Sequence, residues 1–280
     1  MNKIKSFSFQ GVNGAYSELA GKEIYPDASS IACKTFEEMF ECVRQNNADV
    51  AIVPIENSRA GRVADTQSLI PESNLKIIGE YFLAVNHCLL APKGSKIENI
   101  KKVYSHEQAL AQCRNNLLKN KKEMIVVADT AGAAKMVSEN NNIEEAAIAS
   151  ALASKIYNLE IIESNIQDSD HNVTRFLLMA KDMEIVNKKD QKIMTTLVFQ
   201  VRSIPASLYK SLGGFASNGV NITKLESYIH PQGFDVAQFY IDFEGHPEEK
   251  SVKLAIEEMK FFCKKINILG VYKMSDFREK

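Results

Sequence analysis

Val50-Ala51-Ile52-Val53-Pro54-Ile55-Glu56-Asn57-Ser58 is the stretch that decides the fold we expect for this chain. Its first four residues form a continuous apolar run, which is typical of a strand buried on both faces of a parallel sheet. Three polar residues, Glu56 to Ser58, follow directly. Ligands bind beyond the carboxyl ends of strands in open α/β sheets, so these side chains are well placed to contact one. The alternative is that Asn57 or Ser58 caps a helix.

The rest of the first 180 residues alternates strands with helical patterns, which indicates an α/β fold. Ile77 to Leu90 is a second long apolar segment, predicted as a strand that leads into a second lobe. Thr35 and Glu38 match a capping box at the start of one helix. The other expected strands are short apolar runs: Phe7–Phe9, Val103–Tyr104, Ile125–Val127 and Ala147–Ala149.

Residues 181–193 differ in character, because seven of these thirteen residues are charged and none is aromatic. This composition predicts a linker at a domain boundary. The order of patterns beyond it is βαββαβ, which predicts a ferredoxin-like domain with two helices on one face of a small sheet. Its expected strands are Thr196–Val201, Ile222–Ile229, Val236–Phe243 and Ile266–Tyr272, with a hairpin turn at His230–Gly233 and helices opened by Pro205 and Pro247.

Composition narrows the class of protein. The chain has 280 residues, of which 45% are apolar and 25% charged, as in ordinary soluble globular proteins of one or two domains. A net charge of -1 gives no sign of a nucleic-acid or membrane surface. We expect a cytoplasmic protein, because neither a signal peptide nor a membrane span is visible. The cysteines lack metal or disulfide spacing and are predicted to be reduced core thiols: Cys33, Cys42, Cys88, Cys113 and Cys263.

A hydroxyl and a fixed positive charge stand side by side in Asn172-Val173-Thr174-Arg175-Phe176, directly after the polar segment Ser164–His171. Arginine stays protonated and grips a carboxylate through two donors. Threonine supplies a neutral donor beside it. The pair therefore suits an anionic small molecule that must also lose a hydroxyl group.

Two further segments lie where strands lead into helices. The glycines of Gly11–Ser17 let the backbone turn sharply, so free N–H groups at the helix start point above the strand end. Ser105 and Gln108 match a capping box. Gln112 follows Ser105 by seven residues, nearly two helical turns, so the two share a helix face and Gln112 can reach a ligand held between lobes.

Other chemistries lack their motifs. Gly11–Ser17 is neither a dinucleotide fingerprint nor a P-loop. Asp168-x-Asp170-x-Asn172 begins like a calcium loop, but Val173 and Met179 stand where glycine and glutamate are needed. The histidines show no ligand spacing, and no nucleophile elbow supports a hydrolase triad. We therefore expect neither a metal nor a cofactor.

Four segments in order resemble the motifs of the prephenate dehydratase family, and the last of them is the most specific: Gly11–Ser17, Val53–Ser58, Ser105–Cys113 and Asn172–Phe176. The resemblance covers residues 4–180, and the tail looks like the ACT regulatory domain of many members. It implies an α/β, two-lobed catalytic domain of the type II periplasmic-binding-protein kind, followed by a ferredoxin-like ACT domain. The implied borders are 1–181 for the catalytic domain, with lobes at 1–78 plus 165–181 and at 79–164, then a linker at 182–193 and the ACT domain at 194–273.

The resemblance implies conversion of prephenate to phenylpyruvate, with loss of water and carbon dioxide, in phenylalanine biosynthesis. Expelling hydroxide requires a proton or a strong hydrogen bond, and aromatisation then drives the reaction. The enzyme must hold the carboxylates, exclude water and assist the leaving hydroxyl. No electron-sink cofactor is required.

Roles for individual residues follow from the same resemblance. Thr174 would donate to the leaving hydroxyl, and Glu56 would be a proton source if burial raised its pKa. Arg175 would hold the side-chain carboxylate, which leaves the departing ring carboxylate in the apolar setting near Phe176. The other substrate-binding residues implied are Ala15, Tyr16, Ser17, Asn57, Ser58, Ser105 and Gln112.

The tail departs from the common family form at two places. Tyr228-Ile229 stands where Arg-Pro is usual, and Ala206 stands where the first glycine of Gly-Ala-Leu is usual. By resemblance, phenylalanine is the expected effector, bound where two tails pair in a homodimer or homotetramer. The implied effector residues are Ala206, Ser207, Leu208, Asn221, Ile222, Glu226 and Ser227. A purely structural dimerisation module is the alternative.

Competing interpretations remain open. Arogenate dehydratase differs only in an amino group on the substrate side chain. A non-catalytic solute-binding or sensor protein would use the same two-lobed cleft, although Thr174 beside Arg175 favours chemistry over storage. A metal-dependent lyase is a more distant alternative.

Overall fold

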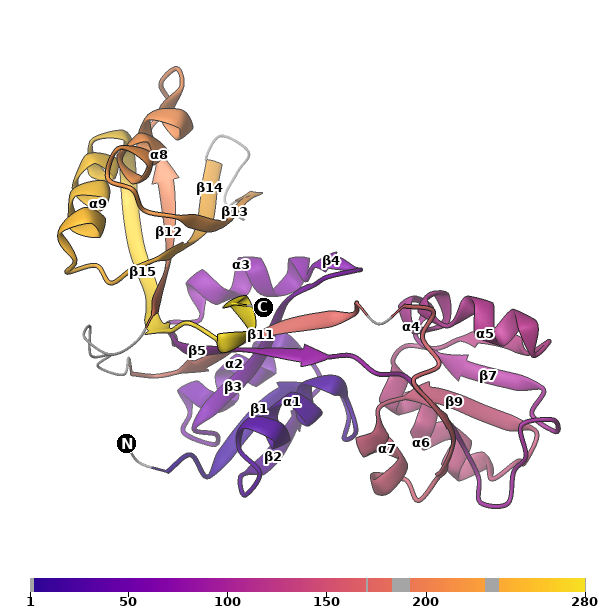
Figure 1. Ribbon diagram of the computed structural model, residues 1–280. Coiled ribbons are helices and arrows are strands. Elements are labelled where there is room, and N and C mark those ends of the chain that lie inside the picture. Colours follow the sequence, from indigo (N-terminus) through magenta and orange to yellow (C-terminus); the bar gives the residue numbers. More distant parts are fainter. Residues whose placement is uncertain (1–2, 170, 183–191, 230–236, 280) are drawn as a thin grey trace. The chain divides into compact units, whose positions relative to one another are not determined.

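The computed structural model describes residues 3–169, 171–182, 192–229 and 237–279, and it divides into two compact units (Figure 1). Unit 1 comprises Met1–Val63 and Phe82–Phe176, and unit 2 comprises Ala64–Tyr81 and Leu177–Lys280. Strands β5 (Lys76–Ala84) and β11 (Val173–Ala180) carry the chain across the division. The expected hairpin turn at His230–Gly233 and most of the expected linker lie outside the described residues. The predicted domain borders stay a prediction.

The first lobe of unit 1 is a sheet in the order β11-β3-β1-β2, with a helix on each face. Strand β1 pairs in parallel with both β2 and β3. Phe7 lies against Gly21 of α1, whereas Ser8, on the opposite face, donates to the carbonyl oxygen of Met39 in α2 (2.9 Å). The elements are β1 (Ser6–Gln10), α1 (Tyr16–Ile24), β2 (Ser29–Cys33), α2 (Phe36–Arg44), β3 (Val50–Asn57) and β4 (Gly61–Arg62).

The second lobe of unit 1 is a five-stranded sheet in the order β10-β6-β9-β7-β8. Its strands are apolar on both faces: Leu89 and Ile148 pack toward α4 and α5, while Leu90 and Ala147 pack toward α6 and α7 (Figure 1). The elements are β6 (Cys88–Ala91), β7 (Lys102–Ser105), α4 (Glu107–Gln112), α5 (Arg114–Lys119), β8 (Glu123–Val126), α6 (Thr130–Asn140), β9 (Glu145–Ala149), α7 (Ala151–Ile156) and β10 (Glu160–Ser164).

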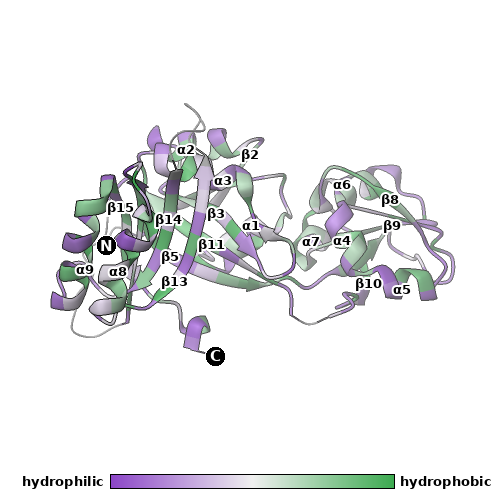
Figure 2. Cartoon of the chain, turned by 90° about the horizontal axis from the view of Figure 1, so that it is seen from above, coloured by the Kyte–Doolittle hydropathy of each residue, from purple (hydrophilic) through white to green (hydrophobic). Residues whose placement is uncertain are grey.

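Unit 2 contains the predicted βαββαβ order, with an antiparallel sheet β13-β14-β12-β15. Leu197 and Phe199 of β12 point into an apolar core with α8 and α9. In Figure 2, α9 carries both hydrophilic and hydrophobic colours, as expected of a helix with one buried face. The elements are α3 (Ala64–Glu72), β12 (Ile193–Val201), α8 (Ser207–Ser217), β13 (Ile222–Ile229), β14 (Ala237–Glu244), α9 (Lys250–Phe262), β15 (Cys263–Lys273) and the 3-10 helix η1 (Asp276–Glu279).

The predicted fold class is therefore confirmed: two α/β lobes followed by a ferredoxin-like arrangement. Thr35 caps α2 as expected, because its hydroxyl accepts from the Glu38 N–H (3.2 Å). The helices after Pro205 and Pro247 begin two and three residues later than predicted, at Ser207 and Lys250. None of the helices in the described ranges combines the length and apolarity that a membrane span requires.

The five thiols are free, and all but Cys42 are buried. Burial raises the pKa of Cys33 to about 11 and that of Cys113 to about 12, so both remain protonated at neutral pH. Burial of four thiols agrees with their prediction as reduced core thiols, whereas Cys42 is only partly buried.

Gly270 marks the position where β15 pairs with β5. A Cβ atom there would lie 2.2 Å from the carbonyl oxygen of Ile77, which is a backbone atom. We predict that Gly270→Ala lowers the free energy of unfolding by about 1–3 kcal/mol, because one strand must shift. Urea denaturation measures the change.

Gly213→Ala is the matched control. Gly213 is exposed in α8, nothing lies within 4 Å of an added Cβ, and alanine improves helix propensity by up to about 1 kcal/mol. An unchanged midpoint for Gly270→Ala would contradict the close approach of β15 to β5.

Candidate active site

Thr174 is held by the carboxamide of Asn57. Asn57 Nδ2 donates to Thr174 Oγ1 (2.9 Å) and to Asn172 Oδ1 (2.8 Å). Asn57 Oδ1 accepts from the N–H groups of Arg59 (2.9 Å) and Ala60 (2.8 Å). All four bonds available to this carboxamide are formed, so its orientation is fixed. It caps the turn into β4 rather than a helix.

The hydroxyl hydrogen of Thr174 remains available to a ligand. Its oxygen accepts from Asn57, and no group in the described ranges accepts its hydrogen. The side chain is partly exposed. A donor on the hydroxyl oxygen also stabilises the negative charge that develops there when the hydrogen is given away. Thr174 is therefore arranged as a hydrogen-bond donor.

The hydrogen bonds continue into a connected set of side chains, which we call the amide network. Asn172 Nδ2 donates to Gln112 Oε1 (2.7 Å), and His87 Nε2 lies 2.8 Å from the same oxygen. A carbonyl oxygen only accepts, so His87 carries a hydrogen on Nε2. In the neutral ring, Nδ1 then accepts from the Tyr16 hydroxyl (2.8 Å). The network thus runs Tyr16–His87–Gln112–Asn172–Asn57–Thr174.

Burial keeps the aromatic end of the amide network neutral. It lowers the pKa of the His87 imidazole, although the bond to Gln112 opposes this. It raises the pKa of the Tyr16 hydroxyl well above its ordinary value, and nearby thiols add to the effect. The Tyr16 hydroxyl also lies 3.0 Å from the carbonyl oxygen of Asn86, which would take its hydrogen if His87 became protonated on Nδ1.

The amide network joins the two lobes of unit 1. Tyr16 and Asn57 belong to the first lobe and Gln112 to the second. His87 and Asn172, on the segments that connect the lobes, link these side chains to one another. Two further bonds link the lobes: Ser150 Oγ donates to the Gly14 carbonyl oxygen (2.7 Å) and Tyr157 Oη to that of Asn13 (2.7 Å).

Gly14 permits this contact. Its φ is +91°, and a Cβ there would lie 2.9 Å from the backbone Cα of Ala153 in α7. Any side chain would therefore strain the turn and push the lobes apart.

The start of α1 presents free backbone donors. Its N-cap, Ala15, makes no side-chain capping bond. The N–H of Ala15 bonds to Val12, and that of Leu19 bonds to Ala15, but the N–H groups of Tyr16 and Ser17 have no acceptor among the described residues. Such a helix start favours an anion, as predicted from the glycine-rich turn.

Arg175 points away from Thr174, into the protein. Only 1% of its side chain is exposed, Nη1 lies 3.0 Å from Glu56 Oε1, and the guanidinium lies 6.0 Å from the ring centre of Phe82. Successive side chains of a strand leave opposite faces, so Thr174 and Arg175 diverge. Arg175 is thus paired with Glu56 in this structure, and its predicted contact with a substrate carboxylate stays a prediction.

The ion pair also bears on Glu56. The Glu56 side chain pairs with Arg175 and is 34% exposed. Its predicted role as a proton source stays a prediction. Phe176, on the same face of β11 as Thr174, is 1% exposed.

Ser58 fastens the segment before Thr174 to the end of β3. Its hydroxyl donates to the His171 carbonyl oxygen (3.1 Å) and accepts from the Val173 N–H (2.9 Å), and its own N–H donates to the Val173 carbonyl oxygen (2.8 Å). Its observed bonds therefore position the strand that bears Thr174.

The predicted capping box at Ser105 is wrong. The N-cap of α4 is His106, whose Nδ1 accepts from the Gln108 N–H (3.3 Å). Ser105 is fully buried and donates to the Ile148 carbonyl oxygen (2.7 Å). Ser105 thus links β7 to β9, and its predicted contact with a substrate stays a prediction.

Fold and geometry together define a two-lobed α/β protein followed by a ferredoxin-like domain. The profile of the family described as prephenate dehydratase matches residues 7–184, which is more than half of the chain. The chain therefore belongs to the prephenate dehydratase family, as the four motifs predicted.

Relatives extend the match to the whole chain. A bifunctional N-acyl-homoserine lactone acylase/prephenate dehydratase of Komagataeibacter europaeus is 42% identical over 280 residues, covering all of both chains. Arogenate dehydratase/prephenate dehydratase 2 of Arabidopsis thaliana is 40% identical over 275 residues, which cover 95% of this chain and 72% of the plant protein.

Two solved structures are also similar. One, described as a novel type of quorum quenching acylase, has a TM-score of 0.93 and 41% identity, covering 98% of this chain and 100% of the other. The other, prephenate dehydratase in complex with L-Phe from Arthrobacter aurescens, has a TM-score of 0.87 and 29% identity, covering 97% and 90%.

Sequence reasoning missed His87. Asn86-His87 interrupts the apolar segment Ile77–Leu90 directly before β6, and this interruption was the available signal. A buried imidazole requires partners. Those partners, Tyr16 and Gln112, lie 71 and 25 residues away in the sequence.

His87 makes stability depend on pH. Its pKa in the folded chain lies below the ordinary 6.5, so the unfolded chain binds the proton first as the pH falls. The contribution of neutral His87 to the free energy of unfolding is fully present above pH 6.5. It is lost as the pH falls toward the folded pKa, by up to about 1.4 kcal/mol per pH unit. We predict that His87→Gln flattens this dependence in urea denaturation between about pH 7 and pH 5.5. A variant with the wild-type slope would contradict the assignment.

Proposed function

We propose that this protein converts prephenate to phenylpyruvate, releasing water and carbon dioxide. One observation carries the proposal beyond the family: the Thr174 hydroxyl is oriented by Asn57 and keeps its hydrogen for a ligand. A dehydratase needs such a donor where hydroxide leaves carbon. The free N–H groups of Tyr16 and Ser17 supply the complementary anion site.

The proposed reaction conserves atoms and charge. Thr174 donates a hydrogen bond to the ring hydroxyl of prephenate. The C–O bond breaks, and the hydroxide takes up one proton to leave as water. The electron pair of the bond to the ring carboxylate moves into the ring, which becomes aromatic as carbon dioxide departs. One proton is consumed, and solvent supplies it in net terms.

In this proposal the amide network orients groups and does not carry protons. Its links through Asn57, Asn172 and Gln112 are carboxamides, and two donors converge on the oxygen of Gln112. A fixed donor aimed at a developing charge costs no reorganisation during the reaction. Because the network joins both lobes, it also sets the spacing between the start of α1 and Thr174.

Arogenate is the alternative substrate, since plant relatives are named arogenate dehydratases. Its side chain carries an ammonium group, which would need a free carboxylate nearby. Glu18, the acid in the first turn of α1, already accepts from the Gly14 N–H (2.6 Å) and the Ser30 hydroxyl (2.6 Å). Glu18 is therefore bonded within its own lobe, and the choice between the two substrates rests on their measured kcat/KM values.

Regulation by phenylalanine at an ACT domain is part of the proposal. It is supported by the βαββαβ order of unit 2 and by the L-Phe complex of the Arthrobacter aurescens relative. Ala206 has a left-handed backbone (φ 59°) at the start of α8, where the common motif has glycine. Asn221 donates to Glu244 (3.0 Å), and Glu226 pairs with Lys224 (3.4 Å). The cytoplasmic location and the homodimer or homotetramer stay predictions.

Thr174→Ala tests the mechanism. We expect kcat for phenylpyruvate formation from prephenate to fall by about 10²–10³-fold, or roughly 3–4 kcal/mol of barrier, because one oriented donor is lost. Thr174→Ser keeps the hydroxyl and is expected to retain most of the activity. Comparing kcat/KM for prephenate and arogenate in the same assays tests the substrate. Near-normal turnover by Thr174→Ala would remove Thr174 from the mechanism.

Hydrolysis of an N-acyl-homoserine lactone is a second candidate, favoured by the 42% identity to the bifunctional relative over the whole of both chains. We expect equal amounts of fatty acid and homoserine lactone to form, with competitive inhibition by prephenate if one site serves both reactions. Product analysis by mass spectrometry measures the release. Hydrolysis that is insensitive to prephenate and to Thr174→Ala would place it at another site.

A further inference from the structure

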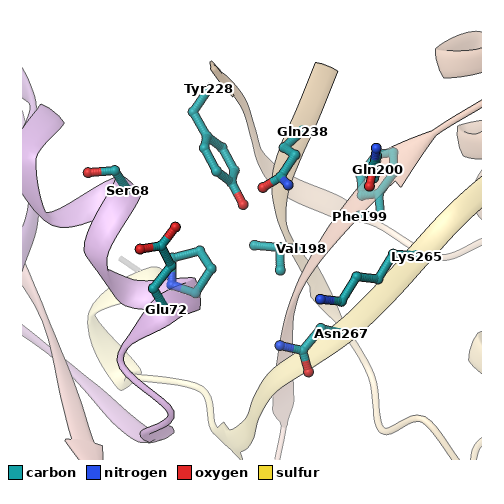
Figure 3. Close-up of a pocket in the computed structure, with 10 residues that line it drawn as sticks. Ser68, Glu72, Val198, Phe199, Gln200, Tyr228, Gln238, Lys265 and Asn267 are labelled. Atoms are coloured by element: carbon teal, nitrogen blue, oxygen red, sulfur yellow. The ribbon is translucent and has the colours of Figure 1, made fainter. Parts of the chain in front are cut away.

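A cavity of about 90 Å³ lies in unit 2, on the face of the sheet opposite α8 and α9 (Figure 3). Leu197 and Phe199 face the helices, so the side chains that alternate with them, Val198 and Gln200, face the cavity. Helix α3 closes the other side through residues that include Glu72. The space is thus bounded by a sheet and a helix of the same unit.

The register of the sheet places four polar side chains in a row across the cavity. Tyr228 pairs with Gln238, Gln238 with Gln200, and Gln200 with Lys265, so the row crosses β13, β14, β12 and β15. Paired residues of neighbouring antiparallel strands share a face. Asn267, paired with Val198, adds another amide. A sheet face covered by a helix is ordinarily apolar, so this row requires an explanation.

The cavity also has an unsatisfied hydroxyl. The Tyr228 hydroxyl is buried and has no hydrogen-bond partner among the described residues. In Figure 3 it points into the same space as the Glu72 carboxylate and the Gln238 amide. Burial, with Glu72 nearby, raises the pKa of Tyr228 to about 12, so the hydroxyl stays neutral and can donate. Leaving such a donor unpaired costs roughly 1–3 kcal/mol.

Opposite charges stand on either side of the cavity. Glu72 comes from α3 and Lys265 from β15, and both side chains are exposed at the rim. Neither makes an ion pair within 4 Å in the part of the chain that the structure describes. One carboxylate and one ammonium that face the same space without meeting each other match a ligand with both charges.

We infer that this cavity binds a small α-amino acid, with its ammonium group at Glu72, its carboxylate at Lys265, and the Tyr228 hydroxyl and Gln238 amide completing the contacts. The enclosed space is small, about 90 Å³, and Glu72 and Lys265 are exposed at its rim, so we expect a small amino acid such as alanine, serine or threonine. The residues of this site differ from those of the phenylalanine site proposed above.

Isothermal titration calorimetry of the full chain with L-alanine, L-serine and L-threonine tests the inference. We expect saturable binding of at least one of them, and no binding of N-acetyl-L-alanine or L-alanine amide, because each lacks one charge. Glu72→Gln and Lys265→Met are each expected to weaken binding by at least about tenfold, as loss of one charge-assisted contact does. Lys264→Met is the matched control. Lys264 is exposed beside Lys265 but lies on the alternate face of β15, so we expect this variant to leave binding unchanged.

Tyr228→Phe provides a second readout that does not depend on the charges. It removes the unpaired hydroxyl, so we expect a higher thermal midpoint without ligand and a smaller upward shift with ligand. Dehydratase turnover without added amino acid is expected to stay unchanged in these variants, so the outcome is separate from that of the Thr174 assay. Absence of saturable binding to all three amino acids, or full binding by Glu72→Gln or Lys265→Met, would overturn the inference and leave a water-filled cavity.

Discussion

The carboxamide of Asn57 is the contact on which the candidate site depends. Its oxygen ties down the turn after β3, and its nitrogen holds both Thr174 and Asn172. A carboxamide with four satisfied bonds has one orientation, and that orientation determines the direction of every amide beyond it. Gln112 then has to present its oxygen to His87, and His87 has to carry its hydrogen on Nε2. The donor at Thr174 is thereby set by a chain of contacts that crosses from one lobe to the other.

The charged side chains that adjoin Thr174 and Asn57 in the sequence, Arg175 and Glu56, pair with each other. Arg175 and Glu56 pair on the other face of the strands, where the guanidinium is covered and also contacts Phe82. Arg175 is buried in this pair and Glu56 is partly exposed, so removing the Glu56 carboxylate would take away a partner of a buried charge. In the proposed mechanism the backbone N–H groups at the start of α1 bind the anionic substrate.

Unit 2 combines a conventional core with an unusual second face. The side with α8 and α9 is filled by aromatic and aliphatic side chains, including a stacked pair of Phe199 and Phe239 at 5.2 Å. The side toward α3 instead carries the polar row that ends at Tyr228 and Lys265. Tyr228 stands at a position where the common family motif has arginine. Among the described residues that line the cavity, it supplies the one tyrosine hydroxyl, which is buried. The two faces of this sheet therefore differ in polarity, and the proposed amino-acid site lies on the polar face.

Local sequence patterns were enough to predict the elements and the family. The apolar run Val50–Val53 predicted a doubly covered strand, the βαββαβ order predicted the tail, and the segment Asn172–Phe176 predicted the family, because local periodicity and motif chemistry are written in neighbouring residues. The contacts that those side chains make became visible only in the folded chain. Because side chains alternate along a strand, Arg175 points away from Thr174. Ser105 is fully buried, and His87 joins the amide network through partners far along the chain. The direction of a side chain and the residues that it contacts depend on which faces pack together in the fold. The spacing of residues within a single segment does not encode this.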